Sequence, residues 1–100
     1  MTTLWARIRL LEGQTLLTAD HQKPFTIVEV TSDRIWFVPK NGMGSRRSWP
    51  RRDMEDVNEK YADVKIITPK MIRDYNPQNQ NTSYVPAILN AVKRADVELG

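Results

Sequence analysis

Cysteine is missing from this chain of 100 residues, and histidine occurs once, as His21. Without cysteine the protein has no disulfide framework, no thiolate zinc site and no cysteine nucleophile. A single histidine has no second histidine with which to share a metal ion, and no serine stands in a recognisable catalytic motif with it. We therefore expect a protein that is not an enzyme and that holds no metal and no cofactor.

Glycine-rich loops and long apolar runs are absent as well. Gly42 and Gly44 lie close together, but they lack the lysine and the following helix of a phosphate-binding loop. No apolar run approaches the roughly 20 residues that span a bilayer. At the N-terminus, Arg7 and Arg9 interrupt the apolar stretch that a secretion signal needs. We expect a soluble, cytoplasmic protein without a membrane partner.

Acidic residues are absent from one stretch, residues 34–52, which carries six basic side chains and is here called the basic stretch. The net charge of the whole chain is only +3, so the positive charge is concentrated locally. Trp36, Phe37 and Trp49 lie among the basic residues. A local excess of positive charge with interleaved aromatics is typical of surfaces that bind polyanions, nucleic acids above all.

The first half of the chain is rich in β-branched and aromatic residues, which predict strands at 15–18, 25–31, 34–38 and 45–49. Asn41-Gly42 is a strong turn signal between the last two strands. The short connections indicate an antiparallel β-meander of three to four strands. Closure of the meander into a small barrel is an alternative.

The second half has apolar residues at helical spacing, which predict helices at 50–61, at 68–75 and from Thr82 or Ser83 onward. Residues 4–12 fit a short helix or an extended arm. Strands followed by three short helices make an α+β fold.

The absence of a linker favours a single domain over residues 1–100. The alternative is a β lobe over 1–49 followed by a helical lobe over 50–100.

The basic stretch has a clear functional interpretation. Side chains on a strand alternate between its two faces, so Arg34 shares a face with Trp36, and Arg47 shares a face with Trp49. If the two strands are neighbours, these pairs form one basic-aromatic surface. Guanidinium groups bind phosphates and indoles stack with bases. The predicted nucleic-acid-binding residues are Arg34, Trp36, Lys40, Arg46, Arg47, Trp49, Arg51 and Arg52.

The same residues also have a purely structural interpretation. The large aromatic side chains are candidates for the core, because such residues dominate small cores. The arginines are close in sequence to acidic residues of the helix at 50–61, and Arg52 and Asp56 have the spacing of an exposed helical ion pair.

The last two helices raise a second possibility, a DNA-binding helix-turn-helix in which the final helix enters the major groove. The connection from Asn76 to Asn81 is longer than the usual turn and opens with a proline. Ordinary core packing of the two helices is the alternative. The secondary contacts that this motif predicts are Lys70, Arg73, Asn81, Thr82, Ser83 and Tyr84.

Two segments resemble a group of small bacterial proteins that open with a β-meander and close with a helix that begins Ser-Tyr-Val. The first runs from Gly13-Gln14-Thr15-Leu16 through Lys23-Pro24-Phe25-Thr26-Ile27-Val28-Glu29-Val30 to Arg47-Ser48-Trp49-Pro50-Arg51, and the second is Asn81-Thr82-Ser83-Tyr84-Val85-Pro86-Ala87-Ile88-Leu89. The resemblance implies the fold and carries no established activity.

The sequence supports two functional hypotheses. The first is a non-catalytic nucleic-acid-binding domain, with DNA favoured over RNA as the partner. The second is a protein–protein interaction module or accessory subunit, in which an exposed tryptophan ringed by arginines is the anchor. The exposure of Trp36 and Trp49 separates the structural interpretation from both hypotheses.

Overall fold

The computed structural model of the chain describes residues 3–19, 22–39, 46–77 and 82–99, and for residues 95–99 it describes the backbone alone. Within these residues the fold is α+β, as the sequence predicts, with a four-stranded sheet and four helices. The strands are β1 (Thr15–Leu17), β2 (Pro24–Val30), β3 (Arg34–Pro39) and β4 (Arg47–Pro50). The helices are α1 (Leu4–Arg9), α2 (Arg51–Lys60), α3 (Pro69–Tyr75) and α4 (Tyr84–Leu99).

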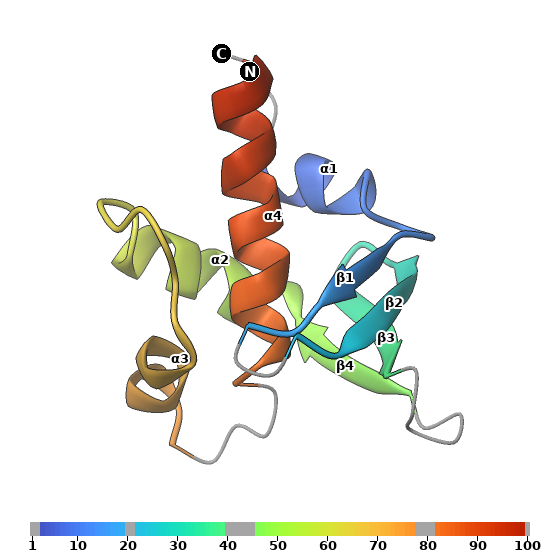
Figure 1. Ribbon diagram of the computed structural model, residues 1–100, viewed down its shortest axis with the longest axis horizontal. Coiled ribbons are helices and arrows are strands. Elements are labelled where there is room, and N and C mark those ends of the chain that lie inside the picture. The colour runs from blue at the N-terminus through green and yellow to red at the C-terminus, as the bar shows by residue number, and fades with distance from the viewer. Residues whose placement is uncertain (1–2, 20–21, 40–45, 78–81, 100) are drawn as a thin grey trace.

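The sheet is an antiparallel meander in which each strand pairs with the next, in the order β1-β2-β3-β4 (Figure 1). Gly13 enters β1 with a φ of 86°, which glycine adopts without strain, and its N–H donates to Ile27 O at 2.6 Å. The sheet does not close, since β1 and β4 remain its two edges. The barrel alternative is therefore wrong.

The structure decides between the two alternatives at the N-terminus and corrects the predicted length of the last helix. The ambiguous segment near the N-terminus forms α1, because Thr3 Oγ1 accepts a hydrogen bond from Ala6 N at 3.2 Å and the helix buries Trp5 and Ile8. A helix therefore precedes the meander. The last helix, α4, extends over 16 residues and is not short. None of the helices in the described part of the chain combines the length and apolarity needed to cross a bilayer.

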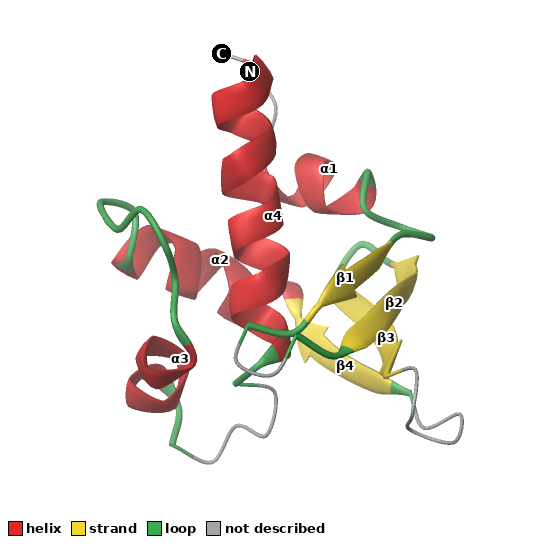
Figure 2. Ribbon diagram, in the orientation of Figure 1, coloured by secondary structure: helices red, strands yellow, loops and turns green. Residues whose placement is uncertain are grey.

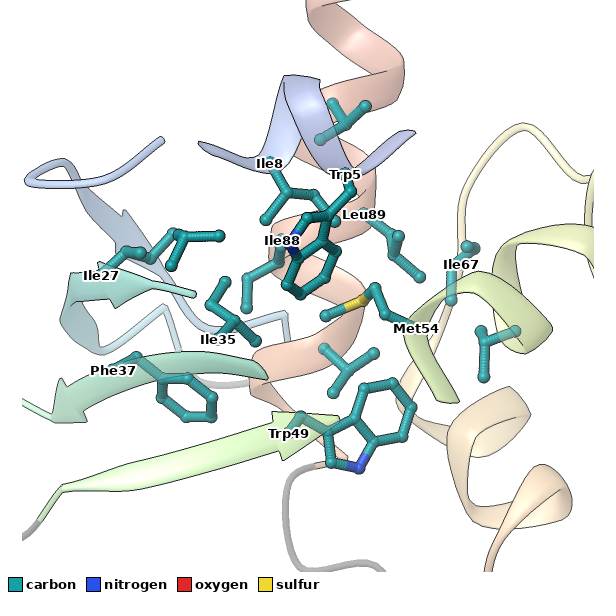
Figure 3. Close-up of a cluster of buried hydrophobic side chains, with 14 of the residues drawn as sticks. Trp5, Ile8, Ile27, Ile35, Phe37, Trp49, Met54, Ile67, Ile88 and Leu89 are labelled. Atoms are coloured by element: carbon teal, nitrogen blue, oxygen red, sulfur yellow. The ribbon is translucent and has the colours of Figure 1, made fainter. Parts of the chain in front are cut away.

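One hydrophobic core joins the strands to the helices. The inner face of the sheet, which points toward the helices, consists of Phe25, Ile27, Val30, Ile35, Phe37 and Trp49, and each of these is at most 7% exposed. The apolar sides of the helices meet it with Trp5, Ile8, Met54, Val57, Ile72, Val85, Ile88 and Leu89. Figure 3 shows this cluster, with Trp49 entering from β4 and Trp5 from α1. Each such side chain contributes about 1.5–3 kcal/mol when it is fully buried.

The central helix of this arrangement is α4, which lies between the sheet and α3 in the view of Figure 2. Asn90 on α4 fixes the extended segment before α3, because its side-chain amide donates to Ile67 O and accepts from Ile67 N, both at 2.9 Å. Thr68 caps α3, and Pro69 occupies its first turn. The helices thus cover one side of the sheet, and the opposite side carries the candidate site.

Candidate functional site

The opposite side of the sheet, here called the outer face, is defined by residues that point away from the core. Register places Trp36 beside Glu29 on β2 and beside Ser48 on β4, so these three side chains form a row across the sheet. All three are half-buried or exposed, in contrast to the inner face. The outer face consists of Thr15, Leu17, Pro24, Thr26, Glu29, Arg34, Trp36, Val38, Ser48 and Pro50, with the Arg46 side chain lying over it.

A β-bulge determines which residue of β2 faces Trp36. The register between β2 and β3 shifts between Ile27 and Glu29, which leaves Val28 outside the register and 40% exposed. Strict alternation from Ile27 would turn Glu29 inward, and the extra residue turns it outward instead. The bulge also returns Val30 to the core. The backbone N–H of Val30 donates to Glu12 Oε2 at 2.8 Å.

Trp36 is the centre of the outer face. The Arg46 guanidinium lies 4.9 Å from the centroid of the Trp36 ring, and the Arg34 guanidinium lies 6.0 Å from it. Both distances are within the range of a cation–π interaction, which contributes about 0.5–1 kcal/mol at an exposed site. The sequence prediction that Arg34 and Trp36 share a face is confirmed, and Arg46 joins them.

The two arginines of this face are held differently. Arg34 Nη1 donates to Ser48 Oγ at 2.6 Å, which fixes the guanidinium against β4. Arg46 Nη2 contacts Glu29 Oε1 at 3.1 Å, and the two side chains are 50% and 53% exposed. An ion pair this exposed contributes little to stability. Arg46 is therefore the more easily displaced of the two cations.

Trp49 and Arg47 do not belong to this surface, which corrects the prediction of one basic-aromatic surface. β3 and β4 are neighbours, but Trp49 pairs with Ile35 and Arg47 pairs with Phe37, so both point to the inner side. Trp49 is 4% exposed and cannot stack with a ligand. The Arg47 guanidinium lies 5.4 Å from the centroid of the Tyr84 ring, on the side opposite to Trp36.

Arg51 and Arg52 are also separated from the outer face, since both belong to α2. Arg51 Nε contacts Glu55 at 2.8 Å, its Nη1 donates to Ser32 O at 3.0 Å, and its guanidinium lies over the Trp5 ring. Within the described part of α2 the helical ion pair is thus Arg51–Glu55 and not Arg52–Asp56. The contacts of Arg51 thus place it at Trp5 and Glu55 and not at Trp36.

Arg52 is exposed and borders a shallow hollow of about 440 Å³ in which carboxylates outnumber arginines. A hollow of this charge does not attract a polyanion. Its lining residues are Ser32, Asp33, Pro50, Arg51, Arg52, Glu55, Asp56 and Glu59.

The packing of α4 favours the alternative of ordinary core packing over a helix-turn-helix. The centroid of the Tyr84 ring lies 5.1 Å from that of Phe25 and 4.9 Å from that of Phe37, so the first turn of α4 is packed on the sheet. Ser83 O accepts from Ala19 N at 3.1 Å. A recognition helix needs its first turn free to enter a groove. Thr82 is half-buried and Lys70 and Arg73 are exposed, while Lys40 and Asn81 lie outside the described residues.

Tyr75 on α3 contacts two carboxylates outside the outer face. The Tyr75 hydroxyl lies 3.4 Å from both Asp53 Oδ1 and Asp56 Oδ2, and its ring packs against Trp49. Burial and the two nearby carboxylates disfavour the phenolate and raise the pKa of Tyr75 from 10.0 to about 12. Among the described residues, no three acidic, histidine or cysteine side chains are grouped so that they could hold a metal ion.

Sequence reasoning missed Glu29 and Ser48. Ser48 had a usable signal, because alternation places it on the face opposite to Trp49. Glu29 had none, because the bulge reverses the alternation and because its partner Arg46 is distant in sequence.

Comparison with known proteins finds no family model that matches the chain, and no significant match among curated proteins or solved structures. The resemblance to small bacterial proteins with a β-meander therefore stays a prediction. The geometry of the outer face is the basis on which a function can be proposed.

Proposed function

We propose that this protein is a non-catalytic nucleic-acid-binding domain and that the outer face of its sheet is the binding surface. The observation that carries the proposal is the placement of Arg34 and Arg46 around Trp36, on the side of the sheet opposite to the core that the helices cover. Guanidinium groups bind phosphate oxygens in forked pairs, and an indole offers a flat apolar surface to a base.

The charge of this surface sets the expected strength of binding. The basic stretch contains six basic residues, but only Arg34 and Arg46 are placed by the described contacts on the outer face. Two phosphate contacts predict a slope of log K against log salt between about −1.4 for a single strand and about −1.8 for a duplex. Binding is therefore expected to be weak and mildly dependent on salt.

The direct test compares two double variants of equal charge. Arg34→Gln with Arg46→Gln removes both cations from the outer face, whereas Arg52→Gln with Arg73→Gln removes two exposed cations elsewhere. Each pair lowers the net charge from +3 by the same two units. Fluorescence anisotropy with labelled DNA at low salt is expected to show that the first pair lowers the affinity for DNA at least about tenfold and the second pair less than about threefold.

Equal losses of DNA affinity in the two double variants would contradict the proposal, because they would show that net charge alone drives the binding. Thermal unfolding of both variants identifies any loss that is due to misfolding. The same titration with RNA of the same sequence tests the preference for DNA.

A protein–protein interaction module is the second candidate, and one observation favours it. Leu17 is 51% exposed and, by its register with Pro24, points to the same side as Trp36. An exposed apolar side chain on a face that also carries a tryptophan and arginines favours a protein partner, because tryptophan and arginine are enriched in the binding hot spots of protein interfaces. If the Arg34 and Arg46 double variant changes the oligomeric state and leaves DNA binding intact, this second function is the better one.

A further inference from the structure

One contact on the outer face makes the proposed function more specific. Arg46 is the residue before β4, and its guanidinium lies over the Trp36 ring and contacts Glu29 on β2. We infer that the outer face takes single-stranded nucleic acid, one base of which stacks on Trp36 after Arg46 has left Glu29 for a backbone phosphate. This inference rests on the proposed function.

The Glu29 carboxylate occupies the position of a phosphate relative to Arg46. It is an anionic oxygen group 3.1 Å from the guanidinium, and phosphate offers the same acceptors with more charge. The two side chains are about half exposed, so water and salt screen their attraction. An exposed pair of this kind shifts an equilibrium by at most about fivefold, so a phosphate can replace the carboxylate at small cost.

The Arg46 guanidinium in turn occupies the position of a base relative to Trp36. It is a flat group 4.9 Å from the centroid of the Trp36 ring, which is half-buried on β3. Stacking of a base on an aromatic side chain favours binding by about tenfold. Stacking therefore outweighs the displaced Arg46–Trp36 contact, which favours the free state by about two- to fivefold. The phosphate replaces Glu29 as the partner of the guanidinium, so the bound arrangement keeps this cation paired.

A duplex cannot make this arrangement. Its bases are stacked on one another and paired, so Trp36 would meet only the sugar–phosphate backbone. The major groove admits a helix or a two-stranded ribbon, whereas Trp36 lies on β3, an inner strand of a four-stranded sheet. The bases of a single strand are free to stack on the open face of a sheet.

The test uses the full chain with an oligothymidine of about 12 nucleotides and a duplex of the same length, at low salt. Tryptophan fluorescence and anisotropy are measured together. Trp5 and Trp49 are 3% and 4% exposed, so quenching by the bound strand reports on Trp36. We expect the single strand to bind about tenfold more tightly than the duplex and to quench the fluorescence.

Three variants sharpen the result. Trp36→Ala is expected to weaken single-strand binding about tenfold and to leave duplex binding unchanged, while Trp36→Phe retains most of the affinity. Glu29→Gln is expected to strengthen single-strand binding by about two- to fivefold, because Arg46 no longer has to leave a carboxylate. Urea unfolding of each variant verifies that it is folded.

The possible failures are distinguishable. If neither DNA binds to the wild-type chain, the proposed function is wrong and this inference falls with it. If the duplex binds as well as the single strand and Trp36→Ala has no effect, the proposed function survives and the single-strand inference is overturned. Weaker binding by a folded Glu29→Gln variant would also overturn it, because Glu29 would then support the bound state.

Discussion

Trp36 and Trp49 lie on adjacent antiparallel strands, one residue out of register, and have opposite environments. Trp49 faces the helices, is 4% exposed and packs against Tyr75 with ring centroids 6.4 Å apart. Trp36 faces away from the helices, is half-buried and has two guanidinium groups within 6.0 Å. The side of the sheet, and not the residue type or its neighbours in sequence, decides which tryptophan supports the core and which can meet a ligand.

The same division applies to the arginines of the basic stretch. Arg34 and Arg46 belong with Trp36, Arg47 lies over Tyr84 on the other side of the sheet, and Arg51 pairs with Glu55 on α2. A stretch that is uniformly basic in sequence is therefore distributed over at least three environments. The first of these combines two guanidinium groups with an aromatic ring on the side of the sheet that faces away from the helices.

The largest effect that separates the two faces is on stability. Trp49→Ala is expected to lower the free energy of unfolding by about 3–5 kcal/mol, because it leaves a cavity between β4 and the helices. Trp36→Ala is expected to lower it by about 1 kcal/mol or less, since its ring is already in contact with water. Urea unfolding followed by far-ultraviolet circular dichroism measures both values.

Trp49→Phe serves as the control for this pair, because it retains most of the buried volume and is expected to keep the chain folded when Trp49→Ala does not. Similar losses for Trp36→Ala and Trp49→Ala would show that both rings are core residues. The outer face would then not be a site.

A smaller effect on the inner side concerns pH. The pKa of Tyr75 is about 12 in the folded protein and 10.0 for an ordinary tyrosine, so the unfolded chain loses this proton first as the pH rises. The stability that depends on the neutral phenol is fully present below pH 10 and is lost as the pH rises toward 12. Tyr75→Phe removes this part of the pH dependence.

Urea midpoints at about pH 8 and pH 11 check this prediction. The wild-type chain is expected to lose more stability between the two values than Tyr75→Phe loses. If the two proteins lose the same stability, the contacts of the Tyr75 hydroxyl with Asp53 and Asp56 do not raise its pKa in the folded protein.

Much of the fold was predictable because its local signals agree. The strand now seen as Arg34–Pro39 was predicted at 34–38, and α2, now seen as Arg51–Lys60, was predicted at 50–61. Pro50 marks the boundary between strand and helix, since it is the last residue of β4 and the N-cap of α2, one residue before the first turn in which the sequence placed it. The segment that forms α1 was ambiguous because the spacing of its apolar residues fits a helix as well as a strand. In the structure, the burial of Trp5 in the core favours the helix.

The site was predictable only in part, because the faces of the sheet depend on how the strands pair with one another. Alternation placed Arg34 with Trp36, and this holds in the structure. The alignment of Ile35 with Trp49 requires knowledge of how β3 and β4 pair, which no local pattern contains. The bulge at Val28 reverses the alternation of faces on β2, so the contact between Glu29 and Arg46 could not be predicted from the sequence.

The most direct measurement of the central claim is a proton–nitrogen correlation spectrum of the three indole N–H groups during titration with oligothymidine. The Trp5 indole donates to Thr31 O at 2.7 Å and Trp49 is buried, so the signals of both are expected to stay in place. The Trp36 signal is expected to move with the added single strand and to reach saturation. A Trp36 signal that stays fixed while other residues respond, or while nothing responds, would contradict the account.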